Sequence, residues 1–138
     1  MPDISIPWEG DLIIGPNGDF VTVSGPTQTK ERIIRRLLTN PLAQDNNGQV
    51  TGQCDYVFHP QYGAGARRLV HTVITPELTQ TVQQRVTEQA LQEPSVVANP
   101  APVVNVKQTP DNLGLAIDAA VATVAGGLVV IPTIQVTP

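Results

Sequence analysis

The residues of this chain best suited to chemistry are a few carboxylates. Hydrolysis of a glycosidic bond needs two carboxyl groups about 5–9 Å apart, one of them with a raised pKa. Glu77, Glu88 and Glu93 lie on or beside one predicted helix, and Asp55 is a carboxylate that could be paired with Glu88. Nothing in their spacing selects such a pair. The sequence therefore predicts no catalytic residues and a protein that is not an enzyme.

One thiol and two imidazoles are the other reactive groups, namely Cys54, His59 and His71. A thiol nucleophile needs a base and a stabilised thiolate, but the carboxylate of Asp55 stands next to Cys54 and opposes the negative charge. The three residues also lack the spacing of a zinc site. Gly63-Ala64-Gly65 lacks the lysine of a phosphate-binding loop. We expect no metal and no cofactor.

The most distinctive stretch runs from residue 55 to residue 65 and reads Asp-Tyr-Val-Phe-His-Pro-Gln-Tyr-Gly-Ala-Gly. It contains Tyr56, Phe58 and Tyr62, three of the four Tyr and Phe residues in the chain. Pro60 restricts the residue before it to extended backbone, and Gly63 permits angles that side chains forbid. The stretch predicts an ordered loop, packed by its rings, that leads into a short helix.

Charge and length limit the function classes. The chain has 138 residues and a formal charge of −4, which favours a single domain and argues against nucleic-acid binding. Met1-Pro2-Asp3-Ile4 does not resemble a secretory signal, and no stretch reaches the ~20 apolar residues of a membrane span. We expect no membrane partner. The basic residues still cluster, as a solvated helix face or as a site for an acidic partner: Lys30, Arg32, Arg35, Arg36, Arg67 and Arg68.

The elements that must position these residues begin with an extended arm at residues 1–9, followed by one domain at residues 10–138. Apolar runs at residues 10–14 and 20–23 flank Asn17-Gly18, which predicts a β-hairpin. A helix is expected from Ser24-Gly25-Pro26 to Asn40-Pro41, with Ile33, Ile34, Leu37 and Leu38 on its apolar stripe. Residues 43–53 are polar and predict a mobile loop.

A second helix is expected from Thr75-Pro76-Glu77 to Glu93-Pro94. Its apolar side chains recur every four residues, and Gln89 is among the polar residues expected to face solvent. The remainder, residues 99–138, predicts strands at 103–106, 113–124 and 128–136 in an antiparallel or mixed sheet. The fold class is therefore α+β. Asp118 is the one charge within residues 112–138, which fits either an ordinary half-buried sheet or an edge that a partner covers.

The order of these features resembles the baseplate wedge and sheath-initiator family of contractile-tailed phages. It is also similar to the sheath-initiator subunit of type VI secretion systems. The resemblance covers about residues 10–136. It rests on three short motifs: Arg35-Arg36-Leu37-Leu38-Thr39, Phe58-His59-Pro60-Gln61-Tyr62-Gly63-Ala64-Gly65 and Glu93-Pro94.

The resemblance implies a protein interface rather than an active site. In that family, a Glu-Pro-Arg motif ends the long helix and docks the protein on a helical bundle of wedge subunits. Ser95 stands here in place of the arginine, so Glu93 and Pro94 carry over and Arg85 is one candidate for the missing contact. The full interface set that we expect is Glu93, Pro94, Arg35, Arg36, Phe58, Pro60, Tyr62 and Gly63.

The resemblance also implies that the C-terminal β-region resembles the interlocking domain of sheath proteins and accepts strands from the first sheath ring. We expect a structural protein of the virion's tail baseplate that joins wedge subunits to the sheath and templates sheath assembly. Six copies per baseplate are implied, with tube or hub proteins as further partners to consider. Two alternatives stay open: a tail lysozyme that cleaves peptidoglycan, as members of this family have been described, and an adaptor that binds a regulatory protein through the same fold.

Overall fold

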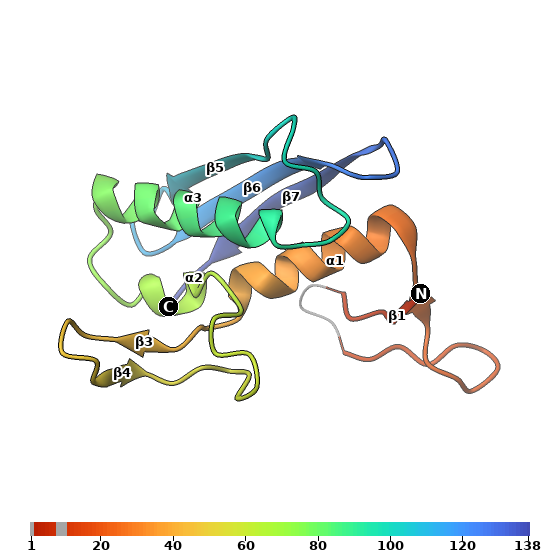
Figure 1. The fold of residues 1–138 in the computed structure, drawn as a ribbon, viewed down its shortest axis with the longest axis horizontal. Helices are drawn as coiled ribbons and strands as arrows, with labels where there is room; N and C mark the ends of the chain where they lie inside the picture. Colours follow the sequence, from red (N-terminus) through yellow and green to blue (C-terminus); the bar gives the residue numbers. More distant parts are fainter. Residues whose placement is uncertain (1, 8–10) are drawn as a thin grey trace.

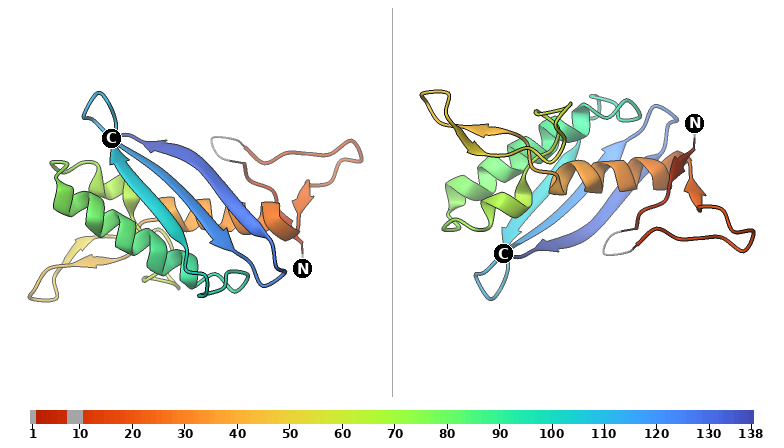
Figure 2. Two further views of the ribbon diagram at one scale, coloured as in Figure 1. Left: turned by 90° about the horizontal axis from the view of Figure 1, so that it is seen from above. Right: turned by 90° about the horizontal axis from the view of Figure 1, so that it is seen from below.

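The computed structural model describes residues 2–7 and 11–138, and it shows an α+β fold of two layers. Two long helices lie against one face of a three-stranded sheet, and no helix or strand of the described residues covers the other face (Figure 1, Figure 2). The predicted fold class is confirmed. The parts of the expected arm and hairpin at residues 1 and 8–10 lie outside the described residues.

Helix α1, Gly25–Leu38, begins and ends where the sequence predicts. Pro26 occupies the first turn, where its missing N–H has no helical partner to lose. The buried face consists of Thr29, Ile33, Ile34 and Leu37. At the far end, both the N–H and the hydroxyl of Thr39 donate to the carbonyl of Arg35, which closes the last turn.

Helix α3, Pro76–Leu91, is capped by Thr75, whose hydroxyl accepts a hydrogen bond from the Leu78 N–H at 3.2 Å. Val82, Val86 and Ala90 face the core as predicted. The prediction that Gln89 faces solvent is wrong, because Gln89 is buried. Its position continues the spacing of three to four residues that places Val82 and Val86 on the inner face.

The C-terminal sheet consists of β5 (Val103–Gln108), β6 (Leu115–Ala122) and β7 (Leu128–Val136), in the order β5-β6-β7. Both pairs are antiparallel, so the mixed alternative is wrong. The β6–β7 register shifts between Ile117 and Ala119, opposite Pro132. The bulge accommodates a proline within a strand and keeps Ile131 and Ile134 on the buried face.

The core lies between the sheet and the two helices. α1 contributes Ile33 and Leu37, α3 contributes Val82 and Val86, and each of these side chains is almost fully buried. The strands supply the largest share of the remaining core: Val104, Leu115, Ile117, Ala119, Val121, Val129, Ile131, Ile134 and Val136. Alternation along each strand leaves the second set of side chains on the uncovered face.

The N-terminal hairpin forms, but its strands pair differently from the prediction. The turn closes through the Gly15 N–H to the Asp19 carbonyl at 2.8 Å, and Ile14 lies opposite Phe20 as a single bridge. Regular pairing occurs instead between β2 (Thr22–Val23) and β1 (Asp3–Ile4). Residues of the expected arm therefore form a strand beside the hairpin, because β2 offers them an unpaired edge.

The prediction of a mobile loop at residues 43–53 is also wrong. Strands β3 (Ala43–Gln44) and β4 (Val50–Gly52) form a small antiparallel hairpin. Its turn is organised by the Asp45 carboxylate, which accepts hydrogen bonds from the N–H groups of Asn47 and Gln49. Polar composition indicated a loop because this turn uses side-chain hydrogen bonds, not apolar packing.

The short helix expected after the aromatic loop is confirmed as α2, Ala66–Leu69. Within residues 2–7 and 11–138, no helix combines the length and apolar character that crossing a membrane requires.

The two helix starts permit a matched test of capping. Thr75 makes a side-chain cap bond, whereas Ser24 at the start of α1 makes none. We expect Thr75→Ala to lower the free energy of unfolding by about 1 kcal/mol, and Ser24→Ala to lower it by clearly less. Urea denaturation followed by circular dichroism measures both. Equal losses would show that the Thr75 bond contributes nothing.

Candidate functional site

The centre of the candidate site is the carboxylate of Glu93, which is only 3% exposed just beyond the end of α3. Nε of Arg36 lies 3.2 Å from Glu93 Oε2, and an Nη1 of Arg32 lies 3.3 Å from Oε1. Both arginines come from α1. The buried negative charge is therefore compensated by two guanidinium groups that reach across from the neighbouring helix.

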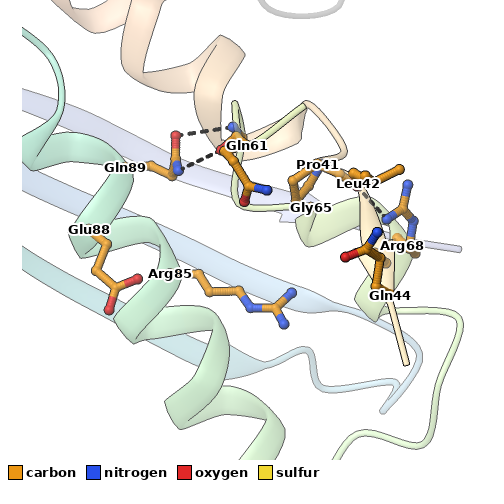
Figure 3. A pocket seen from close by; sticks show the side chains of 11 residues that line it. Pro41, Leu42, Gln44, Gln61, Gly65, Arg68, Arg85, Glu88 and Gln89 are labelled. Atoms are coloured by element: carbon orange, nitrogen blue, oxygen red, sulfur yellow. Dashed lines mark hydrogen bonds between the residues drawn. The ribbon is translucent and has the colours of Figure 1, made fainter. Parts of the chain in front are cut away.

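Gln89 extends this network to the aromatic loop. Its Oε1 accepts hydrogen bonds from the Gly63 N–H at 3.0 Å and from Arg36 at 3.4 Å. Its Nε2 donates to the Gln61 carbonyl at 3.3 Å, as Figure 3 shows. One buried amide thus holds the segment around residues 61–63 against α3.

The ring of Tyr62 stacks on the same arginine. The guanidinium carbon of Arg36 lies 4.4 Å from the Tyr62 ring centroid, a cation–π contact. Tyr56 meets Tyr62 edge to face, with centroids 5.4 Å apart. Burial raises the pKa of the Tyr62 hydroxyl above its ordinary value, against the opposing influence of the Arg36 charge, so the phenol stays neutral at physiological pH.

Asp3 in β1 neutralises much of the remaining basic cluster. Its Oδ2 lies 3.3 Å from Arg32 Nε and 3.8 Å from Arg35 Nη1. Burial on its own would lower the pKa of Arg32, but hydrogen bonds to Asp3 and Glu93 outweigh it and raise the pKa. The three arginines of the cluster that lie on α1 are therefore held in internal ion pairs, which neither of the two interpretations of the sequence anticipated.

The tip of the aromatic loop does not pack as predicted. Phe58 is 93% exposed, and its neighbour Val57 also faces solvent. The loop backbone is nevertheless ordered, because the His59 N–H donates to the Tyr56 carbonyl and the Pro60 carbonyl accepts from the Leu42 N–H. An open recess of about 360 Å³ adjoins the tip, lined by Arg36, Phe58, His59, Pro60, Gln61, Tyr62 and Gln92.

The structure brings Glu93, Arg36, Tyr62 and Gly63 into one network, with Pro94 exposed beside it. Whether any of the expected interface residues contacts a partner stays a prediction. Arg32 and Arg36 are the arginines that lie beside Glu93. Whether Arg85 replaces the contact of the family's missing arginine stays a prediction.

Arg85 belongs to a different recess, about 340 Å³ in volume, between α3 and the segments 41–44 and 61–65. Figure 3 shows its side chain extending across this recess, opposite Arg68. Arg68 donates to the carbonyls of Pro41 and Gln53, so it holds the β3–β4 hairpin near α2. Arg85 forms no ion pair with Glu88 three residues further along.

The residues considered for catalysis serve structural contacts or lie apart. Glu77 and Glu93 stand at opposite ends of α3, which is about 24 Å long, far beyond the separation of a glycosidase pair. Asp55 accepts a hydrogen bond from the Asn40 N–H at 2.6 Å, and Glu88 accepts one from Gln84. In the described part of the chain, no three His, Cys, Asp or Glu side chains gather as metal ligands do.

Sequence reasoning missed the roles of Gln89 and Asp3, and it named Arg32 only as a member of the basic cluster. Gln89 had a usable signal, because residues 82, 86, 89 and 93 share one helix face at spacings of three and four. Asp3 had none, since its role depends on a strand pairing between segments nearly twenty residues apart.

No protein-family model, no curated protein and no solved structure matches this chain. The resemblance to the baseplate family therefore rests on the three motifs and on the order of the sequence features.

The burial of Glu93 predicts that its removal lowers the stability of the fold. Removing one member of a buried ion pair usually costs about 3–5 kcal/mol, because its partners lose their compensation. Here Arg32 is 36% exposed, so solvent screens part of the loss. We expect Glu93→Ala to lower the free energy of unfolding by about 2–3 kcal/mol in urea denaturation. Unchanged stability would contradict the role of this carboxylate; Glu88→Ala, an exposed glutamate on α3, is the control.

The backbone conformation of Gly63 leads to a second stability prediction. Its φ is +108°, and a Cβ there would lie 2.1 Å from the Thr39 carbonyl oxygen. Gly48 also has positive φ, at +79°, but a Cβ there would meet nothing within 4 Å. We expect Gly63→Ala to cost about 3 kcal/mol or more and Gly48→Ala about 1 kcal/mol. Thermal unfolding compares the two, and similar melting temperatures would contradict the close approach.

Proposed function

We propose that this chain is a structural baseplate protein of a contractile tail, which starts the sheath by adding a sheath strand to the free edge of β5. The observation that supports the proposal best is an edge strand without interruption, on a sheet whose outer face is also uncovered. Strand addition gives affinity through main-chain hydrogen bonds and needs no catalytic group.

The register identifies the backbone groups at the β5 edge. The Thr109 N–H donates to the Gly114 carbonyl at 2.9 Å, and bonded and non-bonded pairs alternate along an antiparallel ladder. The backbone groups of Val104, Val106 and Gln108 must therefore point away from β6. Among the described residues none hydrogen-bonds to them. They form three successive sites for an incoming strand.

The opposite edge is less suitable. By the same alternation, the Thr123 N–H bond to the Gly127 carbonyl places Leu128 and Val130 with their backbone groups outward on β7. The next position in that series is Pro132, which has no N–H and lies at the bulge. Prolines and bulges are the devices by which proteins protect strand edges, so β5 is the edge we assign to the sheath.

The outer face of the sheet, beside the β5 edge, is apolar at one end. Val103, Ala120 and Val130 align across the three strands, and Leu128 and Val124 follow toward the β6–β7 turn. The two flanking valines and Leu128 are exposed. At the other end, Asn105 donates to the Asp118 carboxylate at 2.9 Å. A protein without partners does not need an exposed apolar area of this kind. The area therefore supports the proposal that a partner covers this face of the sheet.

Under this proposal, wedge subunits contact the opposite, helical side, where Pro94 and Phe58 are exposed. Glu93 would then act by holding α1, α3 and the aromatic loop in place, since its carboxylate is already bound internally. The protein would be part of the virion's tail baseplate, in six copies if the resemblance extends to symmetry.

The test mixes the purified chain with its cognate sheath protein and images the products by electron microscopy. The wild-type chain should bind one end of the sheath or seed ordered sheath. If sheath assembles without binding the chain when wedge proteins are present, the proposal is wrong. Deleting residues 126–138 is a poor variant, because it would also remove the buried Ile131 and Ile134.

A point change at the β5 edge tests the mechanism. Val106→Pro removes one outward donor, and Val106→Ala matches its loss of packing while keeping the N–H. At about 1 kcal/mol per hydrogen bond, we expect Val106→Pro to bind sheath about fivefold more weakly than Val106→Ala. Equal affinities of the two variants would exclude the β5 edge as the acceptor.

A further inference from the structure

The hairpin at residues 11–23 is an apolar structure without a core. It projects from the end of the molecule where α1 begins (Figure 1). Ile14 is 64% exposed and Phe20, opposite it, is 51% exposed. Leu12 and Ile13 are also exposed, and the hydrophobic core contains no residue of this segment.

Both faces of the hairpin are apolar. Side chains alternate along a strand, so Leu12 and Ile14 share one face with Phe20, and Ile13 lies on the other. The Val21 N–H donates to the Ile13 carbonyl at 2.9 Å, which places Val21 beside Ile13. A strand with a continuous apolar run is typical of burial on both faces. The described residues bury neither face here.

The hairpin is held in a defined position although it lacks a core. Its turn is closed by the Gly15–Asp19 and Gly18–Gly15 backbone hydrogen bonds. At its base, Ser5 donates through N–H to the Val21 carbonyl and through Oγ to Glu31 on α1. A partner would therefore meet a preorganised element, which reduces the ordering entropy lost on binding.

Charge identifies the kind of partner. Residues 1–29 contain no Lys, Arg or His, and the hairpin adds exposed Asp11 and Asp19. Such an element is repelled by phosphate groups, which argues against nucleic acid and anionic lipid. Its complement is an apolar cleft with a basic rim.

The recesses described for this chain do not combine an apolar lining with a basic rim, because the recess that contains Arg68 and Arg85 also contains Glu88 and three glutamines. The apolar recess between the start of α1 and the β6–β7 turn, about 350 Å³ in volume, is lined by uncharged residues only: Gly25, Pro26, Gln28, Thr29, Ser95, Thr123, Val124 and Ala125. The arginines on α1 are already paired with Asp3 and Glu93.

We propose that the hairpin at residues 11–23 is a docking arm, which inserts both of its apolar faces into a basic-rimmed apolar cleft of a different protein in the assembly. This site is separate from the β5 edge. The function proposed above is used only to choose the probes, which are the wedge and sheath proteins encoded with this chain.

The binding experiment measures the affinity of the chain for each purified wedge and sheath protein. Ile14→Asp should weaken binding to one of them at least tenfold, with the melting temperature unchanged because Ile14 lies outside the core. Val73→Asp, at a position that is also exposed and apolar but lies between α2 and α3, should have no effect. Affinity should fall as salt rises, and less steeply in Asp19→Asn. Equal binding by wild type and Ile14→Asp would overturn the docking arm.

A photo-crosslinking residue in place of Phe20 identifies the occupant. A crosslink to an apolar segment flanked by Lys or Arg in a wedge or sheath protein is the expected result. A crosslink to a second copy of this chain, or none within the assembled complex, would overturn the proposal. If the chain fails to seed sheath but still binds a wedge protein through the docking arm, only the proposed role in sheath assembly is wrong. Absence of any complex would remove both.

Discussion

The structure depends on one buried carboxylate. Glu93 stands where α3 ends, in a position almost closed to water, and a lone charge there would be very unfavourable. Arg32 and Arg36 compensate it, and both come from α1. Because both arginines must reach this carboxylate, the ion pairs set the position of α1 relative to the end of α3. Because Arg36 also contacts Gln89 and Tyr62, the same requirement positions the aromatic loop.

That polar network lies on the helical side, and it leaves the sheet free. Apolar packing of α1 and α3 covers one face of β5-β6-β7, so the other face and the β5 edge remain available. The two edges differ physically, since Pro132 interrupts β7 whereas β5 is continuous. A strand edge of this kind specifies the register of an incoming strand, because a slip of one residue would turn all of its side chains to the wrong face.

The N-terminal part follows a different principle. Its hairpin is stabilised by turn hydrogen bonds and polar contacts at the base, while its apolar side chains remain in water. Two-stranded hairpins are marginal by themselves, and exposed apolar residues on both faces add an aggregation risk. Burial in a partner removes both disadvantages. The docking arm and the β5 edge lie on different elements, so one chain could connect two neighbours without competition between them.

The sequence by itself determined the local structure. The starts of α1 and α3, the inner positions of Val82 and Val86 and the three C-terminal strands follow from caps, prolines and periodicity, which act over a few residues. The tertiary structure decided what depends on distant partners. The partners of Gln89 and Glu93 and the pairing of Asp3 with Arg32 each require segments that are far apart in the chain to meet, and the exposure of Phe58 depends on whether another segment covers its ring. Helical spacing could indicate that Gln89 lies on the inner face, but local propensity does not identify the distant partners, because the energy of a buried charge or an exposed ring is set by the whole surrounding fold.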